Sequence, residues 1–177
     1  MIWQPTTYAL ISLCASAIPA VVGYYAWGRR GKPGAVTLAL LLWTLALWGL
    51  LYALELGARA PWPADTLHEL RFGVLVLAPP LWLVFVFQYT GRVAWLTRGF
   101  VALLFVVPAA TLALLFTNEG HGLVWSSEGV SQAGSASLAA FEYGPWFWVD
   151  LSYAVLLVFG GAAGREEEVG LHPGGHT

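Results

Sequence analysis

The chain has 177 residues, of which 58% are hydrophobic and 10% are charged, and its mean hydropathy is +0.68. Soluble domains are about 45–50% apolar and about 25% charged, so this composition excludes a disordered chain and argues against an ordinary soluble enzyme. Eight Lys and Arg residues and a formal net charge of −2 do not make the clustered basic face of a nucleic-acid-binding protein. No nucleic acid is therefore expected as a partner.

Five apolar runs follow one another along the chain. Each is close to the roughly 20 residues that a helix needs to cross a bilayer, and its apolar residues occupy all sides of the helix. Since lipid offers no hydrogen-bond partners, these runs are expected to be helices rather than open strands. We predict an all-α, polytopic transmembrane helical bundle over residues 1–164, surrounded by the lipid bilayer. The predicted spans are 8–27, 35–57, 67–89, 100–116 and 145–164.

The connections between these runs differ in their basic residues, which favour cytoplasmic loops. In the second and fourth connections, 58–66 and 117–144, the one Lys or Arg residue is Arg59. The first and third connections contain Arg29, Arg30, Lys32, Arg92 and Arg98. This asymmetry predicts a multi-pass protein of the inner (plasma) membrane with its N-terminus outside and its C-terminus inside. Residues 165–177 would then be a short, disordered cytoplasmic tail.

Three ionisable side chains lie inside the predicted spans, where such groups are costly and mark candidate sites. Glu55 is near the outer end of the second span and Arg71 is at a similar depth in the third. Because a short connection joins these spans, an ion pair between Glu55 and Arg71 is geometrically reasonable. The alternative is that Glu55 faces interfacial water while Arg71 extends outward to the interface. Asp150 is interpreted as a solvated acid near a helix end.

Prolines and glycines inside the runs provide further local signals. Pro79 and Pro80 remove backbone donors near the middle of the membrane, so they predict a kink, a hinge or the wall of a cavity. Neighbouring groups are expected to satisfy the carbonyls that such prolines free. Gly160 and Gly164 are four residues apart, which indicates a small-residue packing face. No HExxH, CxxC, P-loop or GxGxxG motif is present, so we expect no catalysis, no metal and no cofactor.

Several blocks of residues together indicate a family. The blocks are LEL at 54–56, LRF at 70–72, APPLWL at 78–83, FQYTG at 87–91, TN at 117–118, HGLVW at 121–125 and GPWFW at 144–148. In this order and spacing the chain resembles the N-terminal seven-transmembrane sensor region of bacterial histidine kinases, which also occurs ahead of diguanylate cyclases. The resemblance covers roughly residues 6–160.

The resemblance implies a non-enzymatic sensory input module of a two-component signal transduction system. It implies that the outer helix ends and the fourth connection face a small-molecule or membrane signal, with Glu55, Arg71, Asn118 and His121 as ligand-site or packing candidates. It also implies a homodimer. The family has seven spans followed by an output domain, whereas five are predicted here, so we expect a truncated or frameshifted product. The alternatives are a small membrane carrier or channel subunit, or a membrane enzyme.

Overall fold

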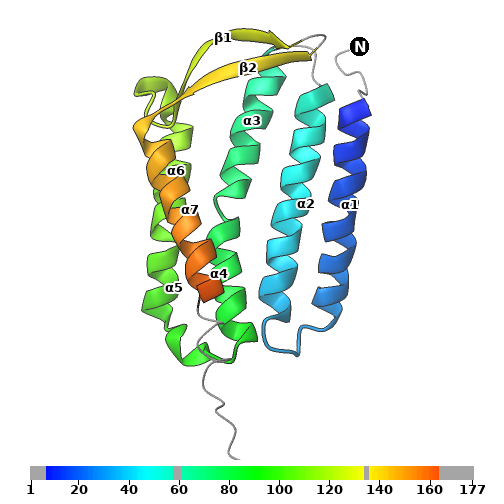
Figure 1. Ribbon diagram of the computed structural model, residues 1–177, viewed down its shortest axis with the longest axis vertical. Coiled ribbons are helices and arrows are strands. Elements are labelled where there is room, and N and C mark those ends of the chain that lie inside the picture. The colour runs from blue at the N-terminus through cyan, green and yellow to red at the C-terminus, as the bar shows by residue number, and fades with distance from the viewer. Residues whose placement is uncertain (1–6, 58–60, 134–135, 164–177) are drawn as a thin grey trace, which may run out of the picture.

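The computed structural model describes residues 7–57, 61–133 and 136–163, which form a bundle of helices with a β-hairpin across one end (Figure 1). The helices are α1 (Thr7–Gly28), α2 (Ala35–Gly57), α3 (Pro61–Leu75), α4 (Ala78–Tyr89), α5 (Arg98–Leu104), α6 (Val106–Phe116) and α7 (Pro145–Ala163). Two short 3-10 helices are η1 (Val93–Trp95) and η2 (Asn118–Gly120), and the hairpin strands are β1 (Trp125–Ala133) and β2 (Ala136–Tyr143). The predicted tail, 165–177, lies outside the described residues.

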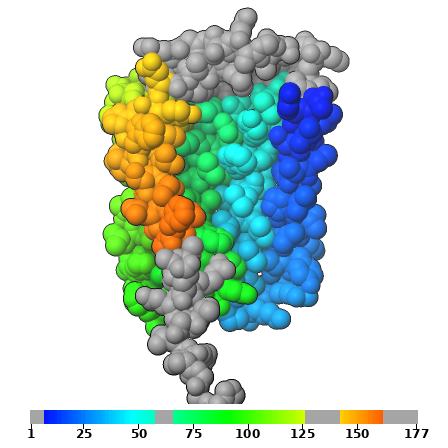
Figure 2. Space-filling model, viewed as in Figure 1, coloured from blue at the N-terminus to red at the C-terminus, as the bar shows by residue number. Residues whose placement is uncertain are grey.

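Length and composition make four helical stretches of the described chain able to cross a membrane. They are Thr7–Gly28, Ala35–Gly57, Thr66–Tyr89 and Arg98–Phe116, and a shorter apolar helix covers Pro145–Gly161. In the space-filling view α1 and α2 occupy one side, α5 to α7 the other, and α3 with α4 lies between them (Figure 2). The prediction of a helical transmembrane bundle is confirmed.

The distribution of side chains is that of a protein surrounded by lipid. On α1, Ile18 is 68% exposed and Val21 is 67% exposed, whereas Ser16 is 8% exposed. Water would favour the opposite arrangement, with aliphatic side chains inside and the hydroxyl outside. Because lipid tails solvate large apolar side chains well, small and polar residues can occupy the helix contacts instead.

The contact between α1 and α2 shows this small-residue packing. A Cβ atom at Gly49 would lie 3.0 Å from the Cβ of Ser16, and one at Gly23 would lie 2.8 Å from the indole of Trp43. Of the packing face predicted at the end of α7, the structure describes Gly160 alone. A Cβ at Gly160 would meet nothing within 4 Å, and Gly164 lies outside the described residues.

Two of the predicted spans are broken by prolines. Pro79 and Pro80 stand in the first turn of α4, and the chain leaves the helix just before them, at Val76 and Leu77. Proline is well accommodated at the start of a helix, where its missing N–H has no helical partner to lose. The kink expected from these prolines is therefore a break between α3 and α4.

The second break, at Phe105 between α5 and α6, shows how a freed carbonyl is satisfied. Pro108 cannot donate to the carbonyl of Leu104, four residues earlier. The hydroxyl of Tyr153 on α7 donates a hydrogen bond to that carbonyl instead. The expectation that neighbouring groups take over from the proline thus holds at this position, and the bond also joins α7 to the broken helix.

Two expectations about the connections need correction. Helix α3 begins at Pro61, within the segment 58–66 that was expected to be a short connection, because proline suits the first helical position. The polar connection 117–144 contains the antiparallel hairpin, with Trp125 paired with Tyr143 and Ala133 with Ala136. Its strands lack a clean alternation of apolar and polar residues, which is why sequence periodicity missed them.

Candidate functional site

Three charged or titratable side chains meet at the hairpin end of the bundle, and we call Glu55, His68 and Arg71 the hairpin-end cluster. Arg71 Nε lies 2.7 Å from Glu55 Oε2, while His68 Nδ1 lies 3.1 Å from Glu55 Oε1 and 3.0 Å from Arg71 Nη2. The three side chains are 14–19% exposed. The structure therefore brings together the two residues singled out in the sequence and adds a third between them.

The geometry of the ion pair is close but not ideal. The Nε–H of Arg71 does not point along the line to Glu55 Oε2, so the contact is an ion pair without a well-aligned hydrogen bond. Charges that are mostly removed from water cost desolvation energy, which the partner must offset. Removing either partner would therefore leave a poorly solvated charge.

His68 gives the cluster two hydrogen-bonding arrangements. A protonated Nδ1 can donate to Glu55 Oε1, and an unprotonated Nδ1 can accept from Arg71 Nη2, but one nitrogen cannot do both at once. The sequence signal was available, because His68 stands three residues before Arg71 and so shares its helix face. This signal is weak by itself, because a histidine near the end of a span can equally face interfacial water.

Aromatic rings enclose the cluster on two sides. The guanidinium carbon of Arg71 lies 4.8 Å from the ring centre of Tyr52 on α2, within range for a cation–π contact. Trp125, the first residue of the hairpin, is 3% exposed and meets the rings of His68 and Phe72 edge-on at 5.2 and 5.0 Å. Trp125 thereby covers the His68 side of the cluster and anchors the start of the hairpin on the same face of α3.

The other two candidates from the sequence, Asn118 and His121, form hydrogen bonds within the connection after α6. Asn118 is 9% exposed; its amide nitrogen donates to the Trp125 carbonyl at 2.6 Å and its oxygen accepts from Val124 N at 3.0 Å. His121 Nδ1 accepts from Leu123 N at 3.1 Å, so in the neutral ring Nε2 carries the hydrogen and donates to Thr117 Oγ1 at 3.0 Å. Both side chains hold the loop that delivers Trp125 to the cluster.

A second polar centre lies deeper in the bundle and corrects an expectation. Asp150 was expected to be solvated, but it is 8% exposed and accepts a hydrogen bond from Thr111 Oγ1 at 2.9 Å. Trp146 Nε1 in turn donates to Thr111 Oγ1 at 3.0 Å. Asp150 faces α6 because it falls one helical turn after Trp146, and α6 supplies the hydroxyl there.

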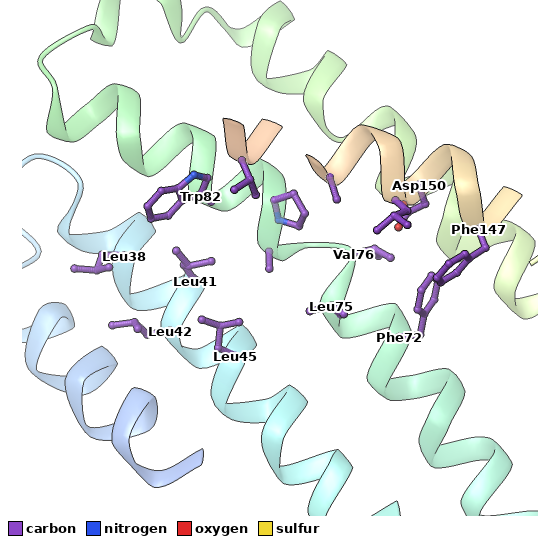
Figure 3. A pocket seen from close by; sticks show the side chains of 15 residues that line it. Leu38, Leu41, Leu42, Leu45, Phe72, Leu75, Val76, Trp82, Phe147 and Asp150 are labelled. Atoms are coloured by element: carbon purple, nitrogen blue, oxygen red, sulfur yellow. The ribbon is translucent and has the colours of Figure 1, made fainter. Parts of the chain in front are cut away.

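A cavity of about 570 Å³ opens beside Asp150, between α2, the break from α3 to α4, and α7 (Figure 3). Leucines of α2 form one wall, Phe72 and Phe147 lie at one end, and Trp82 at the other. Pro79 lines the cavity and Pro80 is fully buried. Among the described residues, no group of three or more His, Cys, Asp or Glu side chains is placed to hold a metal ion.

Comparison with known proteins identifies the family of the chain. Residues 11–164 match the family described as the N-terminal 7TM region of histidine kinase. The chain belongs to this family. The resemblance drawn from the sequence blocks is thereby confirmed, and the matched range contains both polar centres. No curated protein and no solved structure matches the chain.

Proposed function

We propose that the chain is the membrane-embedded sensory input module of a histidine-kinase-type signal transduction protein. The observation that carries this proposal is the family match over residues 11–164, in a chain whose helices have the length and composition to cross a membrane. The family is a non-catalytic region, so the chain's task would be to detect a signal and to change the position of its helices.

The proposed direction of signalling follows from the distribution of charge. The basic residues of the first and third connections favour the cytoplasm, which puts the hairpin end of the bundle outside the inner membrane and the end of α7 inside. A second copy of the chain would be the partner, because helices of two copies can transmit a change in packing to an output domain.

We infer that the hairpin-end cluster couples the signal to the helices. Glu55 lies on α2 and Arg71 lies on α3. Their contact therefore helps to hold the α1–α2 pair in position against α3 and the rest of the bundle. His68 can bond to either Glu55 or Arg71, and Trp125 packs against its ring. A movement of the hairpin that displaces Trp125 could therefore change the Glu55–Arg71 contact. A small molecule or a change in the membrane could act there.

A chimera tests the proposal. Residues 1–164 would replace the membrane region of a histidine kinase, and autophosphorylation would be measured in isolated membranes. We expect Arg71→Ala to change the rate at least threefold, whereas Glu119→Gln, which removes an exposed charge outside the cluster, leaves it unchanged. Identical rates for all three chimeras would contradict the proposed coupling.

A carrier would behave differently, and liposomes separate the two functions. A carrier or channel subunit should move solutes when reconstituted alone, whereas a sensory module needs an attached output domain to produce a response. The absence of solute flux together with a responsive chimera supports the sensor. Flux without a responsive chimera would favour the carrier.

A further inference from the structure

We propose that the cavity between α2, α3, α4 and α7 binds a small lipophilic amine, with its ammonium group at Asp150 and its apolar body among the leucines and aromatic rings. This site is separate from the hairpin-end cluster, and binding to it can be measured on the chain alone. The additional statement that such an amine acts as a signal rests on the proposed function.

The cavity has the size of a small-molecule site. Its volume of about 570 Å³ lies within the roughly 300–1,000 Å³ that ligand pockets occupy. Along α7 its lining runs from Phe147 to Val158, which is about 16 Å at the rise of an α-helix. The space thus extends along α7, and it suits a molecule with an extended apolar body (Figure 3).

The lining of the cavity is almost entirely apolar, and Asp150 is its one ionisable residue. The carboxylate of Asp150 accepts one hydrogen bond from Thr111 and has capacity for more. A ligand that brings an N–H donor would meet this acceptor, whereas a ligand with a carboxylate would meet a like charge.

Charge complementarity decides between an amine and a lipid chain. No Lys, Arg or His among the described residues forms an ion pair with Asp150. A carboxylate away from water is costly unless it is paired. An acyl chain would fill the apolar lining without compensating this charge, whereas an ammonium group would compensate it.

The test measures retention of radiolabelled n-decylamine by the whole chain in nanodiscs of phosphatidylcholine, with empty nanodiscs as background. The same experiment with n-decanoate keeps the apolar body and exchanges the donor for an acceptor. We expect saturable binding of decylamine and none of decanoate. Because no output domain is involved, failure to bind is distinguished from failure to signal.

Two variants locate the site. Asp150→Asn keeps the shape and can still accept from Thr111 but removes the charge, so decylamine affinity should fall at least tenfold. Ala154→Leu fills part of the lining and should weaken binding to a similar extent. Glu119→Gln, an exposed acid outside the cavity, is the matched control and should bind as the unaltered chain does.

Several results would overturn the proposal. Equal retention by loaded and empty nanodiscs would show that decylamine only partitions into lipid. Equal saturable binding of decylamine and decanoate would identify a groove for lipid chains without a head-group site. If Asp150→Asn fails to fold, the Ala154→Leu variant and the comparison of decylamine with decanoate still test the proposed site. Neither of them depends on the Asp150→Asn variant.

Discussion

Single side chains hold this bundle together at a few polar contacts, since most of its surface faces lipid. The Glu55–Arg71 pair joins α2 to α3, and the Tyr153–Leu104 bond joins α7 to the break between α5 and α6. Each contact satisfies a group that lipid cannot satisfy. Their loss should therefore cost more than the loss of an exposed pair in water.

We expect Glu55→Ala and Arg71→Ala each to lower the free energy of unfolding by roughly 1–3 kcal/mol, because each leaves a partly buried charge without its partner. The double variant should cost less than the sum of the two. Reversible unfolding in mixed micelles measures this cycle, with Glu119→Ala as the exposed control. Additive costs would show that the two charges do not interact.

Tyr153→Phe should cost about 1–2 kcal/mol, because the Leu104 carbonyl then has no donor. In a Pro108→Ala background the cost should shrink, since alanine restores the N–H that Leu104 lacks. Tyr89→Phe, at a tyrosine that is 72% exposed, is the control. An equal cost of Tyr153→Phe in both backgrounds would rule out this explanation.

At the scale of elements, small residues set how closely helices approach. Gly49 of α2 faces Ser16 of α1 with room for a hydrogen but little more. The helices themselves were predictable because a long apolar run in lipid has few alternatives to a helix. The breaks at Val76 and Phe105 were harder to place, because a proline disturbs the chain up to four residues before itself.

Gly49→Val should destabilise the bundle by about 1–3 kcal/mol through overpacking against Ser16. Gly160→Val is the matched control, because it adds the same side chain to a helix at a position with nothing within 4 Å. Comparing the two unfolding free energies removes the intrinsic effect of valine in a helix. Equal losses would mean that the α1–α2 contact tolerates larger residues.

At the scale of the whole molecule, the membrane bundle, its family and the closeness of Glu55 and Arg71 could be predicted from the sequence. The hairpin, the burial of Asp150 and the contacts of His68 with Glu55 and Arg71 could not. Hydropathy reports where a helix crosses lipid, but not which face of that helix meets a neighbour. Asp150 illustrates this, because its partner Thr111 is 39 residues away in the chain.

A measurement of membrane topology tests the proposed sensory function most directly, because a sensory module must have its C-terminal end in the cytoplasm. Fluorescent protein and alkaline phosphatase would be fused after Lys32, Arg98 and Arg165, and, for comparison, after Gly120. We predict fluorescence without phosphatase activity at the first three positions and the reverse at Gly120. Phosphatase activity at Arg98 or Arg165 would contradict the orientation and, with it, the proposed route from the hairpin end to a cytoplasmic output.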